Sequence, residues 1–384
     1  MPHILVLNCG SSSVKFALID PISSMSLLTG LAENIGQRNC RIVFNSKQNF
    51  EKIIENGKYK DIFIELKIFL EENDYLDSII AVGHRVVHGG QYFSNSVVID
   101  EENLEKIKDC IPLAPLHNPA NIEGITFCQQ IFSNLPQIAV FDTAFHQTIS
   151  AYVSEYAIPR ELTKKYHIKK YGFHGTSHKY VSTQAAKLLG KKNGNFIVAH
   201  LGNGCSLSAV VEGKSVDTSM GFTPLDGLIM GTRSGSIDAG IFDFLANNLG
   251  WNINKITTIL NKQSGLLGIC GHSDMREISH LANQGDELAK LAIEMFCHRV
   301  VKFVASYMVY FEKFDGLIFT GGIGENAINI RENIVTKLKN IGFKLDHQKN
   351  SNKESFINTQ ESHNIMIINT NEELMIAQET MRLI

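Results

Sequence analysis

The sequence lacks the two phosphate-binding motifs that are most common in nucleotide-dependent proteins. No GxxxxGK segment followed by Ser or Thr occurs, which excludes a P-loop nucleoside triphosphatase. No strand near the start leads into GxGxxG, so a dinucleotide-binding lobe is not expected. A nucleotide site in this chain therefore has to be built from other loops.

Paired cysteines and blocks of positive charge are missing as well. The seven cysteines form no CxxC pair, and Cys9, Cys205 and Cys270 stand beside glycine turns, where a small apolar side chain packs easily. This favours packing over metal binding or redox chemistry and fits a reducing cytosol. The net charge of −3, without a basic block, argues against nucleic acid as a main partner.

Long uninterrupted apolar runs are also absent. The first apolar run covers only residues 4–7 and has no basic flank, so no secretory signal is expected. The most hydrophobic long stretch, residues 288–311, contains Glu294, Arg299 and Lys302. Its apolar positions recur at helical spacing, which predicts a buried helix and no contact with a membrane. We expect a cytoplasmic protein.

Short segments rich in Val and Ile alternate with helical patterns along the chain. Strands are predicted at residues 3–8, 14–19, 40–44, 79–83, 97–99, 137–141, 196–200, 205–211, 214–218 and 316–320. Helices are predicted at residues 49–56, 60–72, 102–109, 119–132, 238–248, 253–260, 276–280, 285–312 and 370–383. The alternation predicts an α/β protein with partly parallel sheets.

One strand and loop recurs in altered form at half the chain length. The segment that starts at Ile4 reads ILVLNCGSSS, and the segment that starts at Ile197 reads IVAHLGNGCS. Each has a polar residue, Asn8 or His200, two places before a glycine, and these residues lie half of the 384-residue chain apart. A single echo of this kind predicts two related lobes that face each other across a cleft. Small residues let backbone N–H groups converge on an anion, so the two loops predict a nucleotide between the lobes.

The length also favours two domains, because 384 residues are many for one core. We expect the first domain to hold residues 1–147 with 372–384 and the second to hold residues 148–371. A hinge is expected near residues 146–155, with the final helix crossing back to the first domain.

Two arginines stand out because they lie among glycines. Arg85 and Arg233 could each bind an anion through two guanidinium nitrogens or be an ordinary surface residue. Composition alone favours the two interpretations about equally. Asp142 ends an apolar strand and is a helix cap, a magnesium ligand or a general base, of which the cap is the simplest.

Two histidines and two glutamates are similarly ambiguous. His174 and His178 are four residues apart, but nearby glycines and the lack of a third ligand argue against zinc. His174 is suited to donate a hydrogen bond to a group that is being transferred. The simpler interpretation is a loop histidine whose hydrogen bonds are made within the protein. Glu372 and Glu373 would ordinarily match the dipole of a helix start.

Taken in order, these clusters closely resemble the acetokinase family, within the actin-like, sugar-kinase and heat-shock ATPase superfamily. The matching segments are ILVLNCGSSSVK, GHRVVHGG, FDTAFH, YGFHGTSH, IVAHLGNGCSLS, GTRSG, HSDMRE, GGIGEN and TNEEL. The resemblance covers essentially the whole chain. It implies two related actin-like (ribonuclease H-like) lobes, mixed sheets flanked by helices, a nucleotide in the cleft and a homodimer.

The resemblance also implies an activity, which is reversible phosphoryl transfer between ATP and acetate. The products are ADP and acetyl phosphate, the cofactor is Mg²⁺ with Mn²⁺ as a substitute, and the expected mechanism is direct in-line attack without a phosphoenzyme. Acetate is already ionised at neutral pH, so Asp142 is expected to orient Arg or Mg²⁺ rather than to accept a proton.

The implied roles fall into four groups. The catalytic residues are Asp142, His174 and Arg233, and the metal ligands are Asn8 and Glu372. The substrate-binding residues are Arg85 for the carboxylate, with Val87, Leu116, Phe173 and Pro224 around the acyl group. The nucleotide-binding residues are Lys15, His200, Leu201, Gly202, Asn203, Gly204, Asp274, Met275, Arg276, Gly322, Ile323, Gly324, Glu325 and Asn326.

Two alternatives remain. A propionate kinase would use the same mechanism, because one extra methylene changes discrimination by only about 1–3 kcal/mol. A superfamily member that uses ATP to switch conformation would keep the phosphate loops but would not need Arg85, Arg233 and His174 around a small anionic acceptor.

Overall fold

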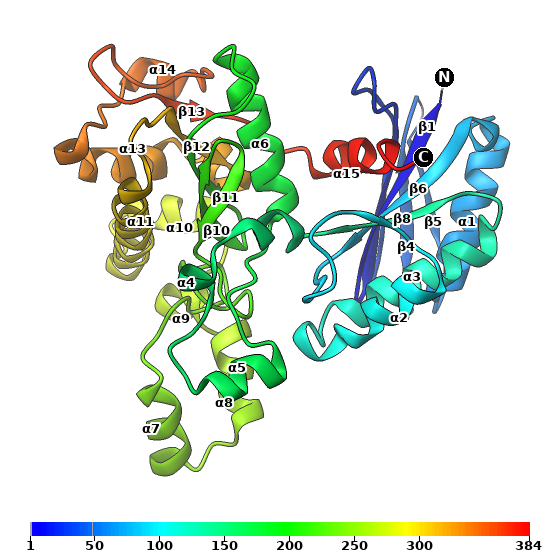
Figure 1. Cartoon of the computed structure of the whole chain (residues 1–384), viewed down its shortest axis with the longest axis horizontal. Coiled ribbons are helices and arrows are strands. Elements are labelled where there is room, and N and C mark those ends of the chain that lie inside the picture. The colour runs from blue at the N-terminus through cyan, green and yellow to red at the C-terminus, as the bar shows by residue number, and fades with distance from the viewer. Residues whose placement is uncertain (1, 48) are drawn as a thin grey trace. The chain divides into compact units, whose positions relative to one another are not determined.

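The computed structural model describes residues 2–47 and 49–384, and the chain divides into two compact units (Figure 1). The first unit runs to Phe145 and takes in Asn371–Ile384, and the second is His146–Thr370. Each unit has a mixed sheet with helices packed on it. The predicted fold class, α/β with two mixed sheets flanked by helices, is confirmed.

The first unit contains an eight-stranded sheet in the order β5-β4-β3-β2-β1-β6-β8-β7. Its strands are β1 (His3–Gly10), β2 (Ser13–Ile19), β3 (Ser26–Glu33), β4 (Arg41–Asn45), β5 (Asn49–Ile53), β6 (Ile79–Val86), β7 (Val97–Val98) and β8 (Gln137–Phe141). Its helices are α1 (Tyr59–Glu72), α2 (Glu101–Asp109), α3 (Asn118–Ile131) and α15 (Glu372–Met381). Strands β1, β6 and β8 run parallel, so their carboxyl ends share one edge.

The second unit contains a five-stranded sheet in the order β11-β10-β9-β12-β13. Its strands are β9 (Phe196–Leu201), β10 (Cys205–Val211), β11 (Lys214–Thr218), β12 (Gly316–Thr320) and β13 (Ile365–Ile367). Its helices are α4 (Ala151–Ser154), α5 (Arg160–Tyr166), α6 (Gly175–Leu188), α7 (Gly240–Leu249), α8 (Ile253–Lys262), α9 (Gly265–Cys270), α10 (Met275–Asn283), α11 (Glu287–Tyr307), α12 (Gly321–Asn326), α13 (Ile328–Lys337) and α14 (His347–Ser351).

The two sheets share one core pattern. In the first, β3, β2 and β1 are antiparallel neighbours and β1, β6 and β8 are parallel. In the second, β11, β10 and β9 are antiparallel and β9, β12 and β13 are parallel. Strands β1 and β9 therefore occupy the same position, as the recurrence at half the chain length predicts.

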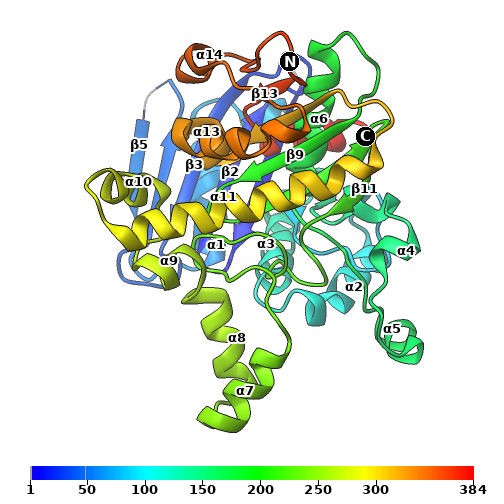
Figure 2. The same ribbon diagram turned by 90° about the vertical axis from the view of Figure 1, so that its left-hand side faces the viewer.

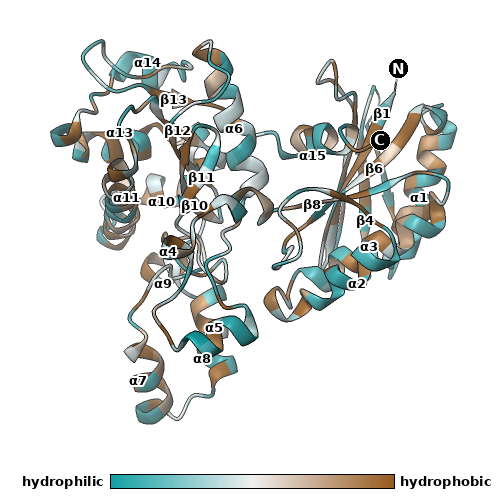
Figure 3. Ribbon diagram, in the orientation of Figure 1, coloured by the Kyte–Doolittle hydropathy of each residue, from teal (hydrophilic) through white to brown (hydrophobic). Residues whose placement is uncertain are grey.

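Packing explains the strongest sequence patterns. Strand β1 is continuously apolar because Ile4–Leu7 are buried on both faces of the sheet. Helix α1 turns Ile62, Leu66 and Leu70 inward at helical spacing. Figure 3 shows both hydrophilic and hydrophobic stretches on α1 and α3, which is typical of helices with one buried face.

Helix α11 is the stretch that was predicted as a buried helix. Its inward residues include Ala292, Phe296, Val300 and Val304, and Figure 2 shows the helix running along the second sheet. Across residues 2–47 and 49–384, no helix combines the length and the apolar character that crossing a bilayer requires.

Several local predictions were wrong. Residues 49–56 were predicted to be a helix, but residues 49–53 form β5, which pairs with β4 and places Phe50 near Phe44. Strand β3 was not predicted, because Gly30 lies within it. In the structure this position requires glycine, since a Cβ would lie 2.1 Å from the Phe16 ring. No helix was predicted around Gly175, but α6 begins there, after His174 adopts a left-handed φ of 57°.

Helix α15 packs on the first sheet, and Gly83 of β6 makes the close approach to it. A Cβ at this position would lie 2.4 Å from Thr380 Oγ1 and 2.8 Å from Ile376 Cγ2. We expect Gly83→Ala to displace α15 and lower the free energy of unfolding by about 1–3 kcal/mol. Urea unfolding of the whole chain measures this, and unchanged stability would contradict the packing described.

Candidate active site

The first unit gathers its charged candidates at the carboxyl edge of its sheet. Arg85 is the penultimate residue of β6, and Asp142 directly follows β8, which is the neighbouring parallel strand. Glu372 is the first residue of α15, and Asn371 caps this helix by accepting a hydrogen bond from Leu374 N at 2.9 Å. The adjacent strand ends and the capped helix start therefore bring Arg85, Asp142 and Glu372 together.

Arg85 and Asp142 form a two-pronged ion pair. Arg85 Nε donates to Asp142 Oδ1 at 3.0 Å, and Nη2 donates to Oδ2 at 2.6 Å. Arg85 Nε also lies 4.0 Å from Glu372 Oε2. Burial alone would lower the pKa of Arg85, but Asp142 and Glu372 raise it overall, so the guanidinium stays charged. The carboxylate of Asp142 therefore accepts hydrogen bonds from Arg85 and does not cap a helix.

Glu372 lies in a crowded ionic environment. Burial raises the pKa of its carboxyl, and Asp142 and Glu373 raise it further, whereas Arg85 and Lys15 lower it. Asn8 lies near the end of β1, opposite Lys15 of β2 in the sheet register. An amide oxygen and a carboxylate are hard oxygen donors of the kind that Mg²⁺ prefers.

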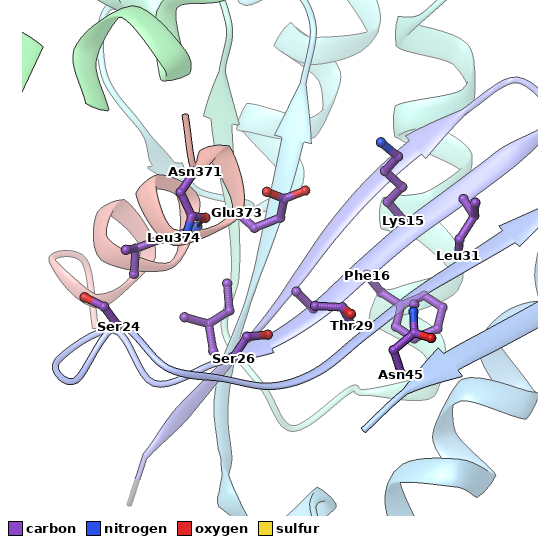
Figure 4. A pocket seen from close by; sticks show the side chains of 13 residues that line it. Lys15, Phe16, Ser24, Ser26, Thr29, Leu31, Asn45, Asn371, Glu373 and Leu374 are labelled. Atoms are coloured by element: carbon purple, nitrogen blue, oxygen red, sulfur yellow. Dashed lines mark hydrogen bonds between the residues drawn. The ribbon is translucent and has the colours of Figure 1, made fainter. Parts of the chain in front are cut away.

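Lys15 lines a pocket of about 280 Å³ in the first unit. Figure 4 shows Lys15 from β2 and Glu373 from α15 among its lining side chains, with Thr29 of β3 and Asn45 of β4. Lys15 therefore lines a pocket beside the start of α15.

Two buried asparagines, which the sequence analysis missed, support the residues that follow β6. Val87 N donates to Asn121 Oδ1 at 3.0 Å, and His88 N donates to Asn118 Oδ1 at 3.1 Å. Asn121 Nδ2 donates to the carbonyl of Cys9 at 2.6 Å, which ties β1 to the same point. The predicted helix start at Asn118-Pro119 was the available signal. Val87 is half-buried here, whereas Leu116 is 61% exposed.

In the second unit, Ser206 of β10 links two histidines. Its Oγ lies 2.9 Å from His174 Nδ1 and 2.8 Å from His178 Nε2. His200, at the end of β9, has its ring centroid 4.5 Å from that of His174, and its Nδ1 lies 2.8 Å from Ser177 Oγ. Burial lowers the pKa of His178 well below its usual value, so this ring is neutral. His174 is thus held in place by a hydrogen bond with Ser206.

The loop after β9 brings His174 and Arg233 together. A Cβ at Gly204 would lie 3.4 Å from His174 Nε2 and 3.8 Å from Arg233 Nη1. Gly231 N donates to Asn203 O at 3.0 Å, so the segment that carries Arg233 is bonded to this loop. The second unit therefore places glycine-rich backbone, an imidazole and a guanidinium at one point.

Arg233 differs from Arg85 in having no counter-ion. Its Nη1 donates to Pro224 O at 3.3 Å, and in the described part of the chain no carboxylate lies within ion-pair distance of it. Burial lowers its pKa. A half-buried cation without a carboxylate partner favours binding of an anion. Phe173 is buried, and Pro224 is half-buried in the same unit.

Several of the other residues that were predicted to bind the nucleotide also form hydrogen bonds or ion pairs within their own segments. Asp274 caps α10 and pairs with Arg276, which lowers the pKa of Asp274 to about 2, and Met275 is buried. Glu325 Oε1 accepts from Gly321 N at 2.9 Å and from Thr370 N at 3.0 Å, so it joins α12 to the segment before α15. At Gly322 an added Cβ would meet nothing within 4 Å, which leaves this backbone open to a ligand.

The chain is similar to known proteins over its whole length. The model of the acetokinase family matches residues 3–378. The acetate kinase of Francisella tularensis subsp. holarctica (strain OSU18) is 70% identical over 385 residues, covering all of both chains. A crystal structure of a propionate kinase from Francisella tularensis subsp. tularensis SCHU S4 shares 70% identity with a TM-score of 0.99, and that of Porphyromonas gingivalis acetate kinase shares 40% with 0.94, each covering both chains fully. The chain belongs to the acetokinase family.

Proposed function

We propose that this protein catalyses reversible transfer of the γ-phosphoryl group of ATP to acetate, giving ADP and acetyl phosphate. The observation that carries the proposal is Arg233, a half-buried guanidinium beside Gly204 and His174 that, within the described residues, has no carboxylate partner. The transferring phosphoryl group has charge on its equatorial oxygens, and a positioned guanidinium stabilises that charge.

The chain's own residues divide the work. The backbone of residues 200–204, together with Lys15, binds nucleotide phosphates, and residues 274–276 and 322–326 bind the adenosine end. Arg85, oriented by Asp142, binds the acetate carboxylate, whose oxygen attacks the γ-phosphorus in line. His174, oriented by Ser206, donates a hydrogen bond to the phosphoryl group as the bond to the leaving oxygen breaks.

Asn8 and Glu372 are the proposed metal ligands, since they supply an amide and a carboxylate oxygen at the carboxyl edge of the first sheet and at the start of α15. A bound Mg²⁺, or Mn²⁺ in its place, would neutralise phosphate charge. No proton transfer is needed on the acceptor, because acetate is ionised at neutral pH.

The acyl preference follows from Val87, Leu116, Phe173 and Pro224, all apolar and moderately bulky, which suits a methyl group. The two Francisella relatives are similar to the same extent, and one is an acetate kinase and the other a propionate kinase. Propionate is therefore the second candidate acceptor.

Acyl hydroxamate formation from ATP, Mg²⁺ and hydroxylamine tests acceptor choice. We expect a strong signal with acetate, a signal about 10–200-fold weaker with propionate, and little with butyrate, because each extra methylene changes discrimination by about 1–3 kcal/mol. Propionate exceeding acetate would make the protein a propionate kinase. ATP binding without any acceptor-dependent product would favour the conformational-switch alternative.

We also propose a cytoplasmic homodimer. Four large apolar side chains at α7 and the start of α8 are 40–60% exposed, which favours a protein partner at this surface: Ile241, Phe244, Leu249 and Ile253. Sedimentation of the purified chain tests the dimer.

A further inference from the structure

The segment that carries Arg233 is a closed loop, which we call the Arg233 loop and define as residues 227–236. Ser236 N donates to Gly227 O at 3.1 Å, and Gly227 N donates to Ser236 Oγ at 2.9 Å. Ser236 Oγ in turn donates to Asp226 Oδ1 at 2.6 Å. These bonds close the neck of the loop, and Gly227 has a φ of 99°, which favours glycine.

The tip of the loop is held by backbone from another segment. Leu266 N donates to Met230 O at 2.9 Å, and Ser264 N donates to Thr232 O at 3.0 Å. A Cβ at Gly265, where φ is 63°, would lie 2.1 Å from Met230 O and 2.5 Å from Arg233 O. The tip is therefore fitted closely to the backbone at the start of α9.

One side chain from outside the loop holds its neck. Arg299, on α11, donates from Nη1 to the carbonyl of Gly227 at 3.0 Å and to the carbonyl of Ser236 at 3.1 Å. Both acceptors belong to the neck, so a single guanidinium nitrogen bonds to both ends of the Arg233 loop. Helix α11 packs on the second sheet and on α9, which makes it a firm support.

We propose that Arg299 is a positioning residue for phosphoryl transfer: it fixes the Arg233 loop, and through it the guanidinium of Arg233, without touching substrate. The inference rests on the proposed role of Arg233. Loss of the two hydrogen bonds lets water reach the neck carbonyls and lets the loop sample other positions. Displacing a catalytic group by about 1 Å costs up to ~10²-fold in rate.

The first test replaces Arg299 by Met, which keeps the length of the side chain and removes its donors. We expect kcat to fall about tenfold, with the KM values for ATP and acetate nearly unchanged, because the effect is on transition-state charge. Arg299→Lys keeps a donor and should recover part of the loss. Lys302→Met is the matched control: Lys302 lies one turn along α11 in the same surface cavity, is exposed, and has no described hydrogen bond. It should keep wild-type kcat.

A double-mutant comparison separates positioning from a general structural role. In an Arg233→Ala background, Arg299→Met should have less than about a twofold further effect on kcat, because its route to the substrate is already gone. The same fold loss in both backgrounds, or the same loss from Lys302→Met, would overturn the inference. Should Arg299→Met not fold, Arg299→Lys carries the same comparison. Near-normal kcat for Arg233→Ala alone would instead show that the proposed function of that residue fails, and the inference with it.

Discussion

Arg233→Ala should lower kcat by about 10³-fold or more while changing the KM values for ATP and acetate far less. The guanidinium lies beside Gly204 and His174, and in the part of the chain that the structure describes no carboxylate pairs with it. Its charge is therefore available to the phosphoryl oxygens, and the benefit is largest when negative charge spreads over them in the transition state. Steady-state kinetics with the hydroxamate assay measure both constants.

Two further variants make the Arg233 result specific. Arg233→Lys keeps the charge but loses the planar fork, so it should recover only part of the rate. Arg160→Ala changes an exposed arginine of the same unit that pairs with Glu155, and it should behave as wild type. A tenfold or smaller fall in kcat for Arg233→Ala, or a loss confined to KM, would remove Arg233 from the chemical step.

Asp142→Asn should lower kcat/KM for acetate by about 10²–10³-fold. The carboxylate is 1% exposed and accepts hydrogen bonds from both Nε and Nη2 of Arg85. Removing one member of a buried, hydrogen-bonded charge pair commonly costs about 2–5 kcal/mol, or roughly 30- to 5,000-fold, and the expected loss lies within that range. The amide retains the size of the side chain but accepts through one oxygen only, so Arg85 loses its fixed orientation toward the acceptor carboxylate.

Stability measurements distinguish orientation from unfolding in this variant. Asp109→Asn, on the exposed end of α2, is the control for loss of a carboxylate in the same unit. If Asp142→Asn keeps the urea midpoint of the wild type and loses activity, the role is orientation. Near-normal turnover would exclude an orienting role, and activity lost only in parallel with unfolding would make the ion pair a structural one.

The parts of the fold that were predictable are those in which burial leaves a pattern. Ile4–Leu7 are apolar because both faces of β1 are covered, and Asn118-Pro119 begins α3 as its residues favour. The parts that failed depend on neighbours. Strand β5 is an exposed edge strand that forms by pairing with β4, and β13 has only three residues and pairs with β12 at the edge of its sheet. Helix α6 follows glycines that by themselves favour a loop.

The site shows the same division. Motifs supplied the identities of Arg85, Asp142 and Arg233, but the pairing of the first two depends on β6 lying beside β8. Ser206, Asn118 and Asn121 could not be identified from the sequence. The role of a hydroxyl or an amide depends on the groups that it contacts in the folded chain, and no motif marks these three residues. Arg299 was read only as a charge that interrupts an apolar stretch, since its acceptors are backbone carbonyls more than sixty residues away in the chain.

The placement of α15 has a consequence for synthesis of the chain. The face of the first sheet around Gly83 is covered by residues that leave the ribosome only after the whole second unit has been made. Until α15 has been made, this apolar face of the first sheet stays exposed to solvent. We therefore expect the nascent first unit to bind a chaperone, and the second unit to fold before the first is complete. A ribosome-stalled chain ending before residue 371 should be more sensitive to protease in its first 145 residues than the released protein.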